Sequence, residues 1–163
     1  MGGAERAALN LADIWSSRQC EVVVMPTFSQ GGSGSFYAVP EKIKIVYLAD
    51  ISKSKRALSR LFALRSFFLK HEFTVVVSFI TNVNVAAIIA GLGCNIPVIV
   101  CERSDPFVIP ISPFWKLARA LTYPFSKHVI IQTDELLDKF KRSASIYKNK
   151  LTVIPNSIPA IFL

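Results

Sequence analysis

The feature that most constrains the fold of this chain is a long stretch without charged side chains, from Phe73 to Cys101. A stretch of this length could cross a lipid bilayer as a helix. Polar and turn-forming residues interrupt it, namely Asn82, Asn84, Gly91, Gly93, Asn95 and Pro97. Its ends, FTVVVSF and IPVIVC, are rich in β-branched residues, and its middle, NVAAIIAGLG, is typical of a helix. We therefore predict a buried strand–helix–strand unit of a parallel sheet, because such strands are apolar on both faces.

The same alternation extends along the rest of the chain. The sequence predicts further strands over residues 20–25, 43–49, 127–133 and 151–155. It predicts further helices over residues 2–18, 52–71, 114–125 and 134–144. Loops are expected at the Gly- and Ser-rich segment 26–36 and at segment 102–113. Alternating strands and helices favour an α/β fold with a doubly wound parallel sheet.

A glycine pair, Gly2 and Gly3, stands directly before the first expected helix. In an open α/β sheet, such a loop follows the first strand and lies at the edge where ligands bind. Free backbone N–H groups and the helix dipole favour a phosphate there. Since no strand precedes the pair, we expect the first strand of the sheet to be missing. A flexible segment before a helix is the alternative to an anion site.

The composition restricts the partners and the chemistry. Nineteen Lys and Arg residues against eleven Asp and Glu give a net charge of +8, which favours anionic partners such as phosphates, acidic lipids or nucleic acid. The cysteines, Cys20, Cys94 and Cys101, lack a paired spacing and lie in apolar runs, so we expect reduced core residues. The two histidines, His71 and His128, have no second ligand at a useful spacing, so no metal site is expected.

The expected helix over residues 52–71 is strongly basic and has no acidic residue. At helical spacing, a core-facing stripe is predicted for Leu58, Leu61, Phe62, Phe68 and Leu69. Another face carries the residues for which we predict contact with an anionic membrane surface, namely Lys53, Arg56 and Arg60 with Phe67 projecting among them. An ordinary solvated basic face is the alternative. Nucleic acid is a competing partner, but no recognised nucleic-acid-binding motif is present.

Four segments carry a resemblance to a known family. In chain order they are GGAERAALNLA, VSFITNVNVAAIIAGLGCNIPVIVCERSDP, VIIQTDELLDKF and LTVIPNSI. Together they resemble the N-terminal half of bacterial family 4 retaining glycosyltransferases, which have two Rossmann-like domains (the GT-B architecture). The resemblance implies a Rossmann-like, acceptor-side domain over residues 1–158 and, over 159–163, the start of a linker to an absent C-terminal domain. We therefore expect a fragment that is truncated at both ends.

The resemblance also implies a set of substrate-binding residues. Gly2 and Gly3 match the glycine-rich loop near the donor diphosphate and the acceptor, and Arg6 belongs to the same motif. The segment ERSDP matches a loop that faces the interdomain cleft, and IPNSI matches the segment that leads to the C-terminal domain. From these two segments the candidate residues are Glu102, Arg103, Ser104, Asp105 and Asn156. Some relatives carry a histidine in the ERSDP position, so only the position is transferred, and no catalytic residue is assigned.

Individual residues have competing roles. Arg103 either places a cation near a phosphate or an acceptor hydroxyl, or forms a local salt bridge that shapes its loop. For Asp105, which precedes a proline, an ordering role in the loop is favoured. Arg6 is expected to be structural, because one turn into the helix it can bridge an acidic neighbour as readily as it can contact a ligand. Thr133 and Asp134 fit the N-cap of a helix.

The resemblance implies transfer of a hexosyl group from a nucleotide diphosphate sugar to a lipid-linked or polysaccharide acceptor in cell-surface glycan synthesis. The reaction would retain the anomeric configuration and need no metal or cofactor. The protein would be cytoplasmic and peripheral on the inner face of the cell membrane, and this half alone would be nearly inactive. The alternative is a non-catalytic basic module that binds a membrane or a partner. A dehydrogenase is disfavoured, because no G-x-G-x-x-G motif is present, and no nucleic-acid partner is expected.

Overall fold

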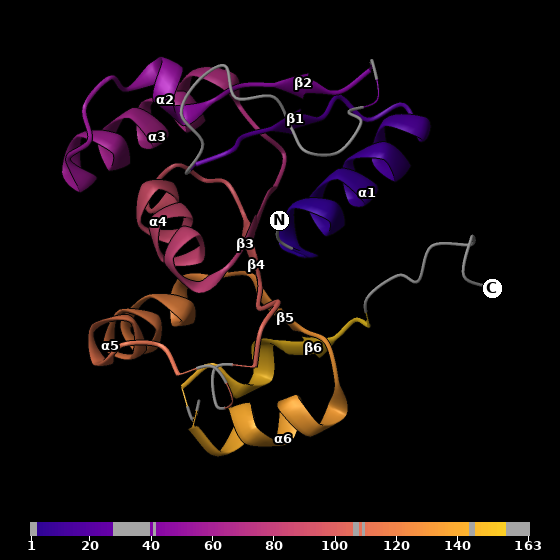
Figure 1. Cartoon of the computed structure of the whole chain (residues 1–163), viewed down its shortest axis with the longest axis vertical. Helices are drawn as coiled ribbons and strands as arrows, with labels where there is room; N and C mark the ends of the chain where they lie inside the picture. Colours follow the sequence, from indigo (N-terminus) through magenta and orange to yellow (C-terminus); the bar gives the residue numbers. More distant parts are fainter. Residues whose placement is uncertain are drawn as a thin grey trace. The chain divides into compact units, whose positions relative to one another are not determined.

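The structure is a computed structural model of the whole chain, and it describes residues 3–27, 40, 42–105, 108, 110–143 and 146–155. The chain forms two compact units, which divide between Ser66 and Phe67. Figure 1 shows the course of the chain through both units. Within the described ranges, no helix combines the length and the apolar character that crossing a membrane requires.

The first unit contains a small parallel sheet and its helices. The elements are α1 (Gly3–Ser17), β1 (Val23–Val24), β2 (Lys44–Ile45), α2 (Leu48–Ile51) and the start of α3 (Ala57–His71). Val23 pairs with Lys44 and Val24 with Ile45, so each strand occupies only two residues of its predicted segment. The strand predicted over residues 43–49 is wrong at its end, because α2 begins at Leu48. The predicted loop at residues 26–36 lies mostly outside the described residues.

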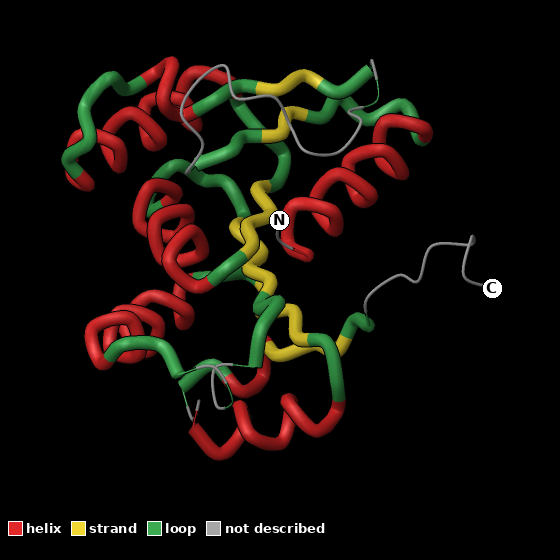
Figure 2. The backbone as a smooth tube through the Cα atoms, viewed as in Figure 1, coloured by secondary structure: helices red, strands yellow, loops and turns green. Residues whose placement is uncertain are grey.

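The second unit is a four-stranded parallel sheet with strand order β3-β4-β5-β6. Its elements are β3 (Val76–Phe79), α4 (Thr81–Gly91), β4 (Val98–Cys101), α5 (Pro113–Thr122), the 3-10 turn η1 (Tyr123–Phe125), β5 (His128–Ile131), α6 (Asp134–Ser143), η2 (Lys148–Lys150) and β6 (Leu151–Val153). Strands and helices alternate along the tube in Figure 2. The predicted α/β fold is therefore confirmed, and the uncharged stretch is the strand–helix–strand unit β3-α4-β4.

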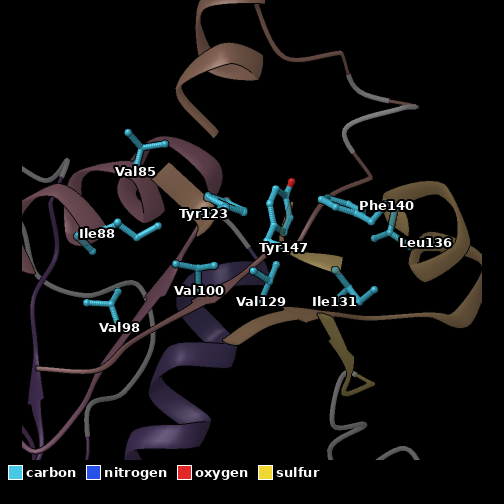
Figure 3. Packing of buried hydrophobic residues seen from close by; sticks show 11 residues of the cluster. Val85, Ile88, Val98, Val100, Tyr123, Val129, Ile131, Leu136, Phe140 and Tyr147 are labelled. Carbon is cyan, nitrogen blue, oxygen red and sulfur yellow. The ribbon is translucent and has the colours of Figure 1, made fainter. Parts of the chain in front are cut away.

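One apolar core holds the second unit together. Figure 3 shows side chains of the cluster gathered beside β4 and β5. Its buried members come from β4 and β5, from α4, η1 and α6, and from the residue before η2: Val85, Ala87, Ile88, Val98, Val100, Tyr123, Val129, Ile131, Leu136, Phe140 and Tyr147. Val98 and Val100 are two residues apart and so point to the same face of the sheet. This burial is the main favourable term that fixes the sheet and the loops at its ends.

Helix α3 differs from its predicted orientation. It begins at Ala57, and its buried residues are Leu64 and Phe68. The side chains of Leu58, Phe62 and Leu69 are exposed, so the predicted core stripe is wrong for these three residues. Apolar residues occupy more than one side of this helix, and periodicity alone therefore does not fix which side faces the core.

The three cysteines are free thiols in different environments. Cys101 is buried, Cys94 is half-buried and Cys20 is exposed. The expectation of core cysteines thus holds for Cys101 and is wrong for Cys20, which follows the C-terminal turn of α1. Burial raises the pKa of the Cys101 thiol to about 11, while the nearby Arg103 charge acts in the opposite direction. Cys101 is therefore a neutral apolar side chain at neutral pH.

Candidate functional site

The candidate site lies at the carboxyl ends of β3, β4 and β5. These strands are parallel neighbours, so their carboxyl ends meet at one edge of the sheet. The amide of Ile80 donates to the carbonyl oxygen of Cys101 at 3.3 Å, and the amide of Glu102 donates to that of Ile130 at 2.9 Å. The ERSDP loop leaves the sheet directly after these bonds. In open α/β sheets, ligands bind beyond this edge.

The turn from β3 into α4 has an unusual backbone at Ile80. Its φ is 76° and its ψ is 135°, and β-branched residues rarely adopt a positive φ. Such backbone strain costs about 1–3 kcal/mol and persists only where surrounding contacts impose it. Here the amide of Asn84 donates to the carbonyl oxygen of Ile80 at 2.8 Å. The sequence did not predict this feature, because nothing in the residue type signals it.

Glu102 stands at the centre of a buried hydrogen-bond network. Its side chain is only 1% exposed. The hydroxyl of Thr81 lies 3.2 Å from one carboxylate oxygen and 3.0 Å from the other, and the phenol of Tyr123 donates a short hydrogen bond to Oε1. Asn84 Nδ2 donates to the Tyr123 oxygen at 3.0 Å and to the Cys101 carbonyl oxygen at 3.2 Å. The first residue of the ERSDP loop is thus anchored to α4 and η1.

The electrostatics of this network favour protons on both acids. Burial raises the pKa of Glu102 above its usual value, while the Tyr123 hydrogen bond, the Arg119 charge and the Thr81 hydrogen bond oppose that rise. Burial also raises the pKa of Tyr123 well above 10, and the Glu102 charge adds to the increase. Arg119 is itself buried, with its guanidinium 4.9 Å from the centre of the Phe140 ring. Tyr123 therefore remains a protonated hydrogen-bond donor throughout the neutral range.

The network contains residues that the sequence analysis did not select as site residues: Thr81, Asn84, Arg119 and Tyr123. A signal for two of them was present. Thr81 and Asn84 are polar, three residues apart on a helix, and enclosed in an uncharged apolar stretch. Polar residues at buried helical positions require partners, and here the partners are Tyr123 and Glu102.

The other ERSDP residues lie closer to the surface. Arg103 is half-buried, with its guanidinium 5.3 Å from the centre of the Phe79 ring, and Ser104 is exposed. Asp105 accepts a hydrogen bond from Lys139 Nζ at 3.2 Å, and the same ammonium lies 2.8 Å from Glu135. The two carboxylates raise the pKa of Lys139, Glu135 more strongly than Asp105. The ion pair between Asp105 and Lys139 joins the loop to α6. Such a contact is what a role of Asp105 in ordering the loop requires.

The remaining predicted substrate residues belong to the first unit or lie outside the described residues. Gly3 is the first residue of α1 in the first unit, where a Cβ atom would meet nothing within 4 Å, and Arg6 is exposed on the same helix. Gly2 and Asn156 lie outside the described residues. The predicted cap of α6 is confirmed for Thr133, since the amide of Leu136 donates to its hydroxyl at 3.2 Å.

The predicted membrane-contact residues are not equally accessible. Lys53 and Arg56 are exposed, whereas the half-buried Arg60 donates a hydrogen bond to the carbonyl oxygen of Thr27. The ring of Phe67 lies 4.4 Å from that of His71 and 5.5 Å from that of Phe73, measured between centres. Phe67 thus packs against neighbouring rings rather than projecting among the basic residues. The large apolar side chains that α3 exposes are Leu58, Phe62 and Leu69.

A metal centre has no support in the described part of the chain. No three side chains of His, Cys, Asp or Glu gather there at distances suited to a shared ion. The polar groups at the sheet edge are hydroxyls, an amide, a guanidinium and one buried carboxylate. The carboxylate, hydroxyls and amide of the Glu102 network are buried and bonded to one another, so the more accessible polar groups of this loop are those of Arg103 and Ser104. A guanidinium and a hydroxyl can bind phosphate or sugar oxygens through hydrogen bonds and charge.

Comparison with known proteins gives two concordant matches. Residues 1–160 match the family described as Glycosyltransferase Family 4. Over 130 residues, the chain is 30% identical to the Campylobacter jejuni protein named GalNAc-alpha-(1->4)-GalNAc-alpha-(1->3)-diNAcBac-PP-undecaprenol alpha-1,4-N-acetyl-D-galactosaminyltransferase. The match covers 76% of this chain and 35% of that relative. The chain thus spans about a third of the relative's length.

Proposed function

The chain belongs to glycosyltransferase family 4, and on this premise we propose that it is the N-terminal, acceptor-side half of a hexosyltransferase. The donor is a nucleotide diphosphate sugar, and the acceptor is a lipid-linked or polysaccharide glycan in cell-surface glycan synthesis. The name of the Campylobacter jejuni relative includes a PP-undecaprenol-linked acceptor, which supports a lipid-linked one here. The place of action is the cytoplasmic face of the cell membrane.

The observation that carries this proposal is the anchored ERSDP loop at the carboxyl edge of the sheet. Glu102 is directed inward and is a positioning residue, because its carboxylate is buried among Thr81 and Tyr123. The following residues, Arg103 and Ser104, then lie where a ligand beyond the sheet edge can meet them. Gly2, Gly3, Arg6, Asp105 and Asn156 remain candidates for donor or acceptor contacts.

The proposed reaction transfers the sugar with retention of configuration. The bond between the anomeric carbon and a diphosphate oxygen breaks, a bond to an acceptor oxygen forms, and the acceptor hydroxyl loses its proton. The nucleoside diphosphate leaves as an anion, so cations and N–H donors near it lower the barrier. Arg103 is the candidate cation in this chain. Because the chain spans about a third of its relative, we expect little or no turnover from it alone.

The test begins with the DNA on both sides of the reading frame, which defines the whole gene product. That product is assayed with UDP- and GDP-linked hexoses and a polyprenyl diphosphate-linked acceptor. We expect sugar transfer, and we expect Arg103→Ala to lower kcat/KM by about tenfold to a thousandfold. Arg142→Ala, which removes an exposed arginine from α6, is the matched control. Absence of transfer from every nucleotide sugar would contradict the proposal.

The alternative, a non-catalytic module that binds a membrane, is favoured by one observation. Lys53 and Arg56 are exposed beside the exposed Leu58 of α3. In this alternative, Lys53, Arg56 and Arg60 meet anionic lipid, and Phe62 replaces Phe67 as the aromatic contact. Joint replacement Arg56→Glu and Arg60→Glu should then weaken binding to anionic vesicles. Unchanged binding of this double variant would exclude α3 as the contact.

A further inference from the structure

Helix α5 has two apolar faces. One packs against the core of the second unit, and the side chains of the other are mostly exposed. On the inner face, Trp115 and Ala118 pack against the core cluster. On the outer face, Phe114, Leu117 and Leu121 are 67%, 60% and 63% exposed. Their spacing of three and four residues places them on one side of the helix. A surface helix ordinarily carries polar residues on its outer side.

The exposed stripe continues beyond the helix. Phe125, in the turn η1, is 65% exposed. In Figure 1, α5 lies at the outside of the second unit, with α4 beside it. We refer to the exposed side chains of Phe114, Leu117 and Leu121, together with Phe125 of η1, as the outer face of α5.

The charged residues of the segment that contains this face are all basic, apart from its histidine. The sequence has no Asp or Glu between Asp105 and Asp134. Lys116 is exposed on α5 itself, and Lys127, two residues after the end of η1, is also exposed. A segment that combines large exposed apolar side chains with exposed lysines and contains no carboxylate suits the interface of a membrane with anionic lipids.

The same helix connects to the candidate site. The loop that begins with Glu102 leads into Pro113, the first residue of α5. The inner side of α5 carries Arg119, and η1 begins with Tyr123, which donates a hydrogen bond to Glu102. The structure therefore joins the ERSDP loop and the outer face of α5 in one continuous segment.

We propose that the outer face of α5 docks on an anionic membrane surface. Resting on the proposed function, this docking holds the ERSDP loop next to the head group of a lipid-linked acceptor. The surface is distinct from the basic segment before α3, and it uses apolar insertion together with two lysines rather than a cluster of basic residues.

The binding test uses the purified chain and vesicles of phosphatidylcholine with or without phosphatidylglycerol. We expect Leu117→Ser with Leu121→Ser to lower the partition coefficient for the anionic vesicles by at least about tenfold, since it removes two insertable side chains. Ile146→Ser is the matched control, because Ile146 is 76% exposed in another segment. Circular dichroism confirms that each variant is folded. Undiminished binding of the double serine variant would overturn the proposal.

Fluorescence locates the contact. The two tryptophans are Trp15 and Trp115, and the ring of Trp115 lies 5.0 Å from that of Phe114, between centres. Because Trp115 faces the core and Phe114 lies on the outer face, the reporter is the variant Trp15→Phe, Trp115→Phe, Phe114→Trp. We expect lipids with brominated acyl chains to quench the indole at position 114. Vesicle binding without quenching would assign the contact to another surface and overturn the proposal. A third outcome is that the wild type forms an oligomer in lipid-free solution, the double serine variant is monomeric, and both bind vesicles equally. That result would assign the face to contact with a second copy of the chain and would also overturn the proposal.

Turnover of the whole gene product separates this proposal from the proposed function. If both hold, the double serine variant has a raised KM for a vesicle-borne acceptor and an unchanged kcat/KM for a short, soluble one. Vesicle binding through α5 without any sugar transfer would leave docking supported and the proposed function contradicted. Sugar transfer with equal KM values in the variant and the wild type would contradict docking alone.

Discussion

At the scale of single residues, the buried network around Glu102 is expected to be sensitive to substitution. Replacement Glu102→Ala would leave the hydroxyls of Thr81 and Tyr123 without their shared acceptor in a buried place. An unsatisfied buried polar group costs about 1–3 kcal/mol, so we expect the free energy of unfolding to fall by about that amount. Urea denaturation measures it. Glu135→Ala, which removes an exposed carboxylate from α6, should change it by less than about 1 kcal/mol.

The same residue makes a signed contribution to pH dependence. Burial raises the folded-state pKa of Glu102 above its unfolded value. Between these two pKa values the folded state binds the additional proton, so the free energy of unfolding decreases as pH rises. The contribution is fully present below the unfolded pKa, about 4.3, and is lost as pH passes through the folded pKa.

Glu102→Gln should remove this decrease in the free energy of unfolding with rising pH, because the amide stays neutral and keeps the shape of the acid. Urea denaturation of the wild type and of the variant across this pH range checks it. Identical pH slopes in the two proteins would show that Glu102 does not titrate there with a raised pKa.

At the scale of elements, the contact between α4 and β4 depends on the absence of a side chain at Gly91. A Cβ atom there would lie 2.9 Å from Val98 Cγ2, and both residues are buried. Overpacking of a core costs about 1–3 kcal/mol, although alanine recovers up to about 1 kcal/mol through its helix propensity. We therefore expect Gly91→Ala to destabilise the protein. In a double-mutant cycle with Val98→Ala, a coupling above about 0.5 kcal/mol would support the clash, and additivity would refute it.

The order of the elements was predictable because local sequence decides it. Runs of β-branched residues gave β3, β4 and β5, and the uncharged stretch between them gave α4. The buried side of α3 and the short length of β1 and β2 were not predictable, because both depend on what packs against them. For the site, strand alternation located the ERSDP loop. The inward direction of Glu102 was not predictable, since Thr81 and Tyr123 each lie 21 residues away in the sequence.

At the scale of the whole molecule, the two units differ in how their sheets are held. The strands β1 and β2 have two residues each, and those residues are half-buried or exposed. In the other sheet, β4 and β5 each have a neighbour on both sides and carry fully buried residues, among them Val100 and Val129. Short strands without a buried face are marginal by themselves. The first unit should therefore open at a lower cost in free energy than the second.

Amide hydrogen exchange tests this difference. We expect the amides of β4 and β5 to exchange only through global unfolding, because their hydrogen bonds lie in the interior of the sheet and beside the apolar core. The paired amides of β1 and β2 should exchange at least about tenfold faster, which corresponds to a difference in opening free energy of about 1.4 kcal/mol. Equal protection in both sheets would mean that the chain unfolds as one cooperative unit. In that case Glu102→Ala should accelerate exchange in both sheets equally, whereas in the expected case it accelerates exchange in β4 and β5 and leaves β1 and β2 unchanged.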